Sequence, residues 1–329
     1  MDLSLAPRVQ HGVSIKPSEA LRFLGALLAA AVLLVLLVVR VTGDRPDPQP
    51  PTAGQTSPPA PPALPPLQAS TAGPASPAPG GCAAAGWARA AATNGAQLST
   101  LAWAPFRRPE TGWETYAPLI AREIGTACPP QSEAFAAALA DWQDRQRLPA
   151  DGVLKEPDFI RMKGVIQTRR PFVRASAQGV CPPGPDAAAL EWNRPGEGYG
   201  GKAIQLRPEA FAAYRRMAEA ARAEVHEIAA DPRNLTIFSG YRSPESDAAR
   251  CVTDGNCDGV VRATCSPHRT GTALDMYVGQ APGFGPDSTA DPNRLFMSRT
   301  PTYRWLVRNA DRFGFVSYPF EPWHWEWRG

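Results

Sequence analysis

The sequence predicts an α+β domain at its C-terminus, with a mostly antiparallel sheet and flanking helices, and a small helical domain before it. A single transmembrane helix and a disordered linker are expected to precede both domains. Three observations predict this organisation: an uncharged apolar run near the N-terminus, a proline-rich segment after it, and later helical and strand-like patterns without regular β-α-β alternation. The 34 basic and 31 acidic side chains give a net charge of only +3, which argues against a nucleic-acid-binding protein.

Residues 23–39 form a run of 17 residues without a charge, composed mainly of Leu, Val and Ala. At about 1.5 Å per residue the run spans roughly 26 Å, enough to cross a hydrocarbon core. We therefore predict a cytoplasmic tail over 1–20 and a transmembrane signal anchor over 21–41, in the cell (inner) membrane. A cleaved signal peptide is the alternative, but the run is long for one and no Ala-x-Ala site follows before Asp44. The later domains are then expected in the periplasm or another extracytoplasmic space.

Residues 42–81 are expected to form a disordered linker rich in Pro and Ala. Positions 44–80 hold 13 prolines among 37 residues, together with small and polar side chains that cannot bury a core. At about 3.1 Å per residue, an extended chain of this length reaches on the order of 100 Å. Such a tether suits a protein that acts on the cell wall beyond the membrane, although it would also simply separate a domain from the bilayer.

Six cysteines, all after the predicted membrane span, indicate disulfide bonds in an oxidising compartment. They are Cys82, Cys128, Cys181, Cys251, Cys257 and Cys265. Their grouping predicts one bond between Cys82 and Cys128, and pairing of the other four among themselves around the second domain's active-site loop. A cysteine-ligated zinc site is the alternative, but the chain contains no Cys-x-x-Cys spacing.

The first domain, residues 82–172, is expected to be helical. Phe135, Leu139 and Trp142 recur at i, i+4 and i+7, which predicts one buried helical face, and a turn follows at 149–152. The run from Phe135 to Leu154 resembles the end of a peptidoglycan-binding-domain repeat, although Trp142 stands where that family usually has Phe. The alternative is a small helical domain whose aromatic side chains only form its core.

The second domain, residues 183–329, follows a boundary marked by residues 173–182 and the Pro/Gly-rich "CPPGPD" at 181–186. A long helix is expected from Pro208 to just before Asp231. Another helix has Thr300 at its N-cap and Pro301 in its first turn, and it ends at Gly314. Short strands are expected at 235–238, at 272–278 and at the C-terminal end of the chain.

Two of the four histidines lie in patterns that suit metal binding. His268 stands seven residues before Asp275, and Gly271 allows a tight turn between them. In the final strand the side chains alternate, so three tryptophans face a core and His324 faces the other side. Two imidazoles and one carboxylate form a three-ligand zinc set that leaves a fourth position for water.

Acidic side chains flank His324 on both sides. Glu321, three residues before it, is well placed to take a proton from the attacking water. Glu326 is the rival base, but its place two residues after His324 suits an indirect or surface role better.

Four motifs in order carry a family resemblance. They are "SGYRS" at 239–243, Ser266-x-His268-x-x-Gly271-x-Ala273-x-Asp275, "YRWLVRNADRFGF" at 303–315, and Glu321-Pro-Trp323-His324. With them, residues 195–328 resemble the VanY-like zinc D-alanyl-D-alanine carboxypeptidases and endopeptidases of bacterial cell-wall metabolism.

This resemblance implies a zinc metallopeptidase that binds one Zn²⁺ per chain and acts on peptidoglycan stem peptides. The zinc ligands that it implies are His268, Asp275 and His324. Glu321 would be the general base, and Arg242 would polarise the scissile carbonyl or stabilise the oxyanion. Ser266 and Trp323 would line the substrate site.

The stretch between Arg242 and His268 departs from the family pattern. It carries three cysteines, whereas many relatives have a shorter connection without cysteine and with a glutamine near its start, so substrate preference could differ. A serine-type D,D-peptidase is disfavoured because no Ser-x-x-Lys occurs. The alternative from another class is a catalytically silent peptidoglycan-binding or regulatory protein on a peptidase scaffold. Whether a carboxypeptidase or an endopeptidase is encoded stays open.

Overall fold

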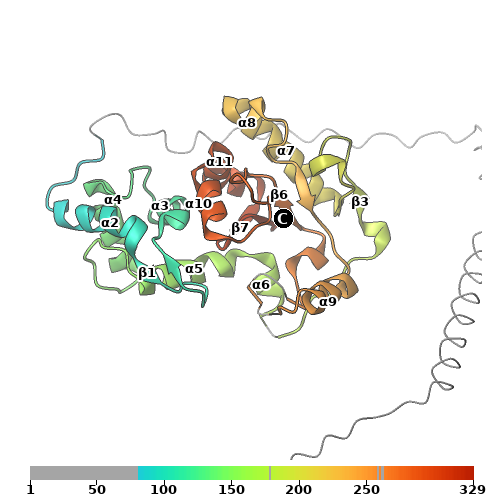
Figure 1. Ribbon diagram of the computed structural model, residues 1–329, viewed down its shortest axis with the longest axis horizontal. Coiled ribbons are helices and arrows are strands. Elements are labelled where there is room, and N and C mark those ends of the chain that lie inside the picture. The colour runs from blue at the N-terminus through green and yellow to red at the C-terminus, as the bar shows by residue number, and fades with distance from the viewer. Residues whose placement is uncertain (1–80, 178, 258, 261–262) are drawn as a thin grey trace, which may run out of the picture. The chain divides into compact units, whose positions relative to one another are not determined.

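The computed structural model describes residues 81–329, apart from residues 178, 258 and 261–262. The predicted tail at 1–20, the anchor at 21–41 and all of the linker except its last residue lie outside the described residues. Within the described part, no helix is both long and apolar enough to span a bilayer. The described residues show the mixture of helices and antiparallel sheets that the sequence predicts (Figure 1).

The central sheet has four antiparallel strands in the order β5-β6-β8-β7. Their bounds are β5 Ile237–Ser239, β6 Ala273–Met276, β7 Phe315–Tyr318 and β8 Glu321–Trp327. The strand expected at 235–238 begins later because Leu235 adopts a left-handed backbone with a φ of 68°, which an extended strand cannot include. The sheet therefore starts at Ile237.

Helices α7 (Pro208–Glu224), α8 (His226–Ala230) and α11 (Pro301–Asn309) pack against the apolar side of this sheet. Their side chains share one core with Leu274 and Trp325 of the sheet. The expectation of one continuous helix from Pro208 to just before Asp231 is wrong, because the segment forms two helices. Val225 is extended (φ −135°, ψ 111°) and divides it into α7 and α8.

The start of α11 is as predicted, but the α-helix ends at Asn309, before the expected end at Gly314. The Thr300 hydroxyl accepts a hydrogen bond from the backbone N–H of Tyr303 at 3.2 Å, and Pro301 occupies the first turn. A 3₁₀ turn over Ala310–Phe313 follows, and Gly314 ends it in a left-handed conformation with a φ of 82°. Local capping chemistry therefore fixes the segment that leads into β7.

The N-terminal part of the described chain is helical, as predicted, and includes one short β-ribbon. Its elements are α2 (Ala88–Thr100), β1 (Ala102–Trp103), β2 (Glu110–Thr111), α3 (Ala117–Ile124), α4 (Glu133–Arg145), α5 (Glu156–Arg169) and α6 (Pro171–Ala175). The predicted helical face is buried, because Phe135 and Leu139 are wholly inaccessible and Trp142 nearly so.

Phe320, in the turn between β7 and β8, helps to complete the core of this helical part. The Phe106 and Phe320 rings lie 5.0 Å apart, and Phe320 belongs to the same core as Trp142. Arg294, itself buried, donates to the Phe320 carbonyl at 2.9 Å and pairs with Glu110 at 3.3 Å. Residues 81–329 thus pack as one compact unit, and the division at 173–182 into two domains stays a prediction.

Short strands, two further helices and several 3₁₀ turns complete the described chain. They are β3 (Glu191–Trp192), β4 (Gln205–Leu206), α9 (Pro244–Thr253), α10 (Asp291–Arg299) and the 3₁₀ turns Glu114–Tyr116, Ala187–Ala189, Tyr199–Gly201 and Pro267–Thr270.

Three disulfides confirm the predicted grouping of the cysteines. Cys82 pairs with Cys128, and the other four pair among themselves. The second and third bonds join Cys181 to Cys265 and Cys251 to Cys257. Cys251 lies on α9, and Cys265 lies two residues before the Pro267–Thr270 turn.

Candidate metal centre

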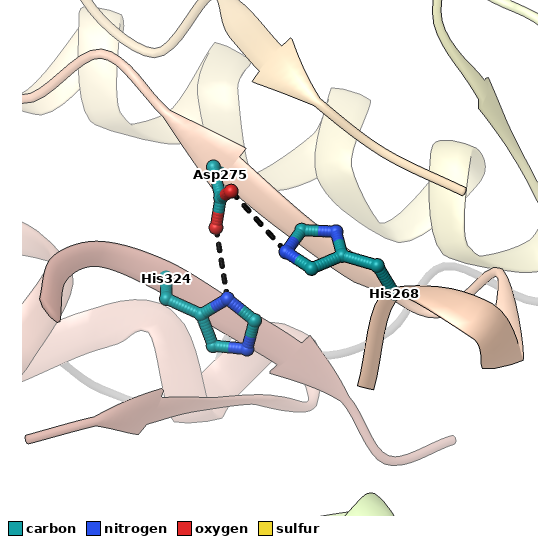
Figure 2. A group of neighbouring side chains, drawn as sticks. All are labelled: His268, Asp275 and His324. Atoms are coloured by element: carbon teal, nitrogen blue, oxygen red, sulfur yellow. Dashed lines mark hydrogen bonds and ion pairs between the residues drawn. The ribbon is translucent and has the colours of Figure 1, made fainter. Parts of the chain in front are cut away.

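Asp275 and His324 are brought together by strand register. They are directly opposite each other in the antiparallel pair of β6 and β8, and the Asp275 Oδ1 lies 2.8 Å from the His324 Nδ1. His268 approaches from the Pro267–Thr270 turn, with its Nε2 3.2 Å from the Asp275 Oδ2 (Figure 2). The two rings therefore face the two oxygens of one carboxylate.

Local backbone structure sets the position of His268. The Ser266 hydroxyl accepts a hydrogen bond from the His268 backbone N–H at 3.2 Å and caps the turn. Gly271 ends the turn with a φ of 70°, and a Cβ there would lie 2.9 Å from a Leu190 methyl carbon. Only glycine suits both conditions. The expected tight turn between His268 and Asp275 is therefore present.

Each imidazole has its second nitrogen facing a separate group. The Nδ1 of His268 lies 2.8 Å from the Gly240 carbonyl and donates to it, which leaves the Nε2 lone pair directed at Asp275. The Nε2 of His324 faces the Glu326 Oε1 at 3.4 Å, which leaves its Nδ1 directed at Asp275. The Gly240 carbonyl and the Glu326 carboxylate thus each face one nitrogen of a ring, and the other nitrogen of each ring faces Asp275.

The electrostatics of the site follow from burial and from Asp275. Burial, together with the nearby Arg242 charge, lowers the pKa of His268 from 6.5 to about 4, although Asp275 opposes this. Burial also acts to lower the pKa of His324, but hydrogen bonds to Asp275 and Glu326 outweigh it and raise that pKa to about 9. Burial would raise the pKa of Asp275, yet the two imidazoles hold it well below its ordinary value.

The donor set fits a divalent metal ion. His268, Asp275 and His324 are all buried, and each offers a ligand atom within 4.8 Å of the others. Two imidazole nitrogens and one carboxylate oxygen match the protein ligands of catalytic zinc sites. These are the three residues that the sequence singled out for zinc.

The other predicted site residues line the same cleft, which has a volume of about 390 Å³. Glu321 is the first residue of β8, and Arg242 follows β5. Ser266 and Trp323 also contribute to its lining. The structure therefore brings the predicted site residues together with His268, Asp275 and His324.

The sequence motifs did not point to two further residues of this region, Asp247 and Arg170. Asp247, buried on α9, lies between Arg242 and Arg269, with side-chain N···O distances of 3.7 and 3.6 Å. Its place shortly after "SGYRS" was a signal that could have been used. Arg170, at the end of α5, forms an ion pair with Glu326. No local pattern marks Arg170, because its partner lies 156 residues away.

Glu326 is buried rather than exposed, so the surface role considered for it is wrong. The side chains of β8 alternate as predicted. Trp323 and Trp325 enter the main core and Trp327 packs at its edge, while His324 and Glu326 share the opposite face. That face is where the donors converge.

An α+β domain with a buried set of two histidines and one aspartate has the protein ligands that catalytic zinc sites use. Comparison with family models identifies the particular family: residues 203–329 match the model for VanY, D-alanyl-D-alanine carboxypeptidase. This segment is therefore a VanY-type domain, and the family resemblance is confirmed. The match does not cover residues 82–172, so the peptidoglycan-binding character of that part stays a prediction.

Three solved structures also align with the chain. The LD-carboxypeptidase LdcB is 24% identical, with a TM-score of 0.27, over 38% of this chain and 60% of its own. A mutant of the vancomycin-resistance D,D-pentapeptidase VanY in complex with Zn(II) is 23% identical, with a TM-score of 0.26, over 45% of this chain and 83% of its own. VanYB in complex with D-alanine-D-alanine is 22% identical, with a TM-score of 0.26, over 45% and 82%. No curated protein matches the sequence.

Proposed function

We propose that this chain is a zinc peptidase that hydrolyses peptide bonds of peptidoglycan stem peptides. One observation carries the proposal: the buried ligand atoms of His268, Asp275 and His324 lie within 4.8 Å of one another beside a cleft. The VanY family match supports a peptidase of the D-alanyl-D-alanine carboxypeptidase type.

His268, Asp275 and His324 would hold one zinc ion through Nε2, a carboxylate oxygen and Nδ1. When bound, zinc acts as a Lewis acid towards a carbonyl oxygen and lowers the pKa of water. The chain's own contribution is to keep these donors buried and aimed at one point. A buried site also strengthens the electrostatic interactions within it.

Glu321 would act as the general base, because it lines the cleft and is only partly buried. It would take a proton from the attacking water and later give that proton to the leaving amine. Arg242 would stabilise the negative charge that develops on the carbonyl oxygen. Ser266 and Trp323 would contact the peptide on the cleft wall.

The bond that is cut decides between a carboxypeptidase and an endopeptidase. We would incubate the zinc-loaded protein with purified muropeptides and identify the products by mass spectrometry, with metal content measured on the same sample. Loss of one terminal D-alanine would indicate a carboxypeptidase, and cleavage of a cross-link or of an internal stem bond would indicate an endopeptidase. Zinc binding without any cleavage would favour the alternative, a silent wall-binding or regulatory protein.

We also propose that the chain is held at the inner membrane by residues 21–41, with residues 82–329 outside the cytoplasm. The three disulfides support an oxidising, extracytoplasmic compartment. Membrane fractionation of the full chain tests the anchor. An anchored protein stays with the membranes through an alkaline carbonate wash, whereas release by that wash contradicts the proposal.

A further inference from the structure

The corner between α5 and α6 contacts the metal centre from outside the VanY-type segment. In Figure 1, α5 leads from the helical part of the chain towards α6. Gln167, Arg170, Phe172 and Val173 at this corner line the same cleft as the three metal donors. The helical part therefore supplies one wall of the candidate active site.

Arg170 is held at this corner by several groups. Its Nη1 donates to the Gln167 Oε1, 2.6 Å away. Its guanidinium carbon lies 4.4 Å from the centre of the Tyr318 ring. Its Nε donates to the Glu326 Oε1 at 2.6 Å, and Nη2 contacts the same oxygen. Arg170 thus has a single defined orientation towards Glu326.

Glu326 is fixed just as firmly. Its side chain is only 1% exposed, and its Oε2 accepts the backbone N–H of Phe172 at 3.1 Å. The Oε1, held by Arg170, faces the His324 Nε2 at 3.4 Å. An unbroken series of polar contacts therefore runs from the α5–α6 corner through Glu326 and His324 to Asp275.

A buried ion pair is a poor device for stability alone, because desolvation of both charges offsets their attraction. The position of the Arg170–Glu326 pair beside His324 suggests a role in orienting that ring. A carboxylate that accepts the second N–H of a metal-binding histidine fixes the ring and makes the other nitrogen a stronger donor. Arg170 holds that carboxylate so that it points at the ring.

We propose that Arg170 and Glu326 are positioning residues of the metal centre. They hold His324 with its Nδ1 towards Asp275. Through Arg170, the helical part of the chain therefore contributes a residue to the metal site. The inference rests on the proposed function only in taking zinc as the bound metal.

The test measures the zinc affinity of metal-free protein by competition with a chromophoric chelator. The variants are Glu326→Gln and Arg170→Met, and the matched control is Arg169→Ala, whose side chain pairs with Glu123 on the surface. We expect each of the two variants to bind zinc about 10–100-fold more weakly, the range typical for such outer partners, and the control to match the wild type. Arg170→Lys, which keeps the charge, should recover part of the loss.

A purely structural role would leave the metal geometry unchanged once the protein is folded. The visible spectrum of the Co(II)-substituted protein reports that geometry, and we expect it to shift in both variants. Circular dichroism of the metal-free forms checks folding. If a single variant does not fold, the charge-neutral double variant Arg170→Met/Glu326→Gln takes its place, with the same weaker zinc binding expected.

Folded variants with wild-type zinc affinity and an unchanged Co(II) spectrum would overturn the positioning role. That result differs from a failure of the proposed function, in which the wild-type chain itself would bind no zinc.

Discussion

Asp275 and His324 lie opposite each other on β6 and β8, with the carboxylate Oδ1 2.8 Å from the imidazole Nδ1. Since His268 reaches the other carboxylate oxygen at 3.2 Å, Asp275 is the residue that both imidazoles share. The carboxylate therefore lies between the two buried rings, as three ligands of one metal ion would. The same three groups would turn their lone pairs to a metal ion.

Replacing Asp275 with Asn should therefore remove the metal site. The amide keeps the size of the side chain but loses the negative charge that offsets the charge of a divalent ion. We expect the zinc content to fall from about one ion per chain to nearly none, measured by plasma mass spectrometry after dialysis. Asp144→Asn, at an exposed position on α4, is the control and should keep its zinc.

Zinc binding should strengthen as the pH rises. In the metal-free chain the pKa of His324 is raised to about 9, so below that pH its Nδ1 carries a proton that zinc must displace. His268, with a pKa of about 4, is already neutral there and adds no proton. Between pH 6.5 and 9 we expect the affinity to rise up to about tenfold per pH unit and then to level off. Calorimetry in two buffers of different ionisation enthalpy counts the protons, and zero release would contradict this.

Glu321→Ala should separate catalysis from metal binding. The side chain is not among the three donors, so zinc content should stay at the wild-type level. The loss of the general base should lower kcat by about 10²–10⁴-fold. Muropeptide turnover followed by chromatography measures this, with the exposed Glu209→Ala on α7 as the control. Retained turnover would refute the role of Glu321.

Local patterns and the family motifs together named the residues that the structure gathers at the cleft. His324 could be assigned to the face opposite the tryptophans because strand side chains alternate, and the Thr300 cap could be read because capping is a local interaction. The contact between Arg170 and Glu326 could not be predicted, because the pair is 156 residues apart. The packing of Phe320 into the helical core is tertiary in the same way.

Arg242→Ala should weaken transition-state stabilisation without removing the metal. Arg242 lines the cleft, and its Nε lies 3.7 Å from the buried Asp247. Loss of one group that stabilises an oxyanion typically costs about 10²–10³-fold in kcat, and we expect a change in this range. Steady-state kinetics on a stem peptide measures it, and the exposed Arg216→Ala serves as the control. An unchanged kcat with a raised KM would instead assign Arg242 to substrate binding.

The turn at Gly152 should be far less tolerant of a side chain than the helix end at Gly125. Both glycines are left-handed, with φ values of 68° and 79°, so alanine at either site should cost about 1–2 kcal/mol of backbone strain. A Cβ at Gly125 meets no atom within 4 Å, whereas one at Gly152 would lie 2.6 Å from the Ala136 carbonyl oxygen and 2.8 Å from the Trp87 ring. Gly152→Ala should therefore lower the free energy of unfolding by at least about 1 kcal/mol more than Gly125→Ala, since overpacking adds to the strain. Urea unfolding of the two variants measures the difference, and equal losses would show that the helical part relaxes around this turn.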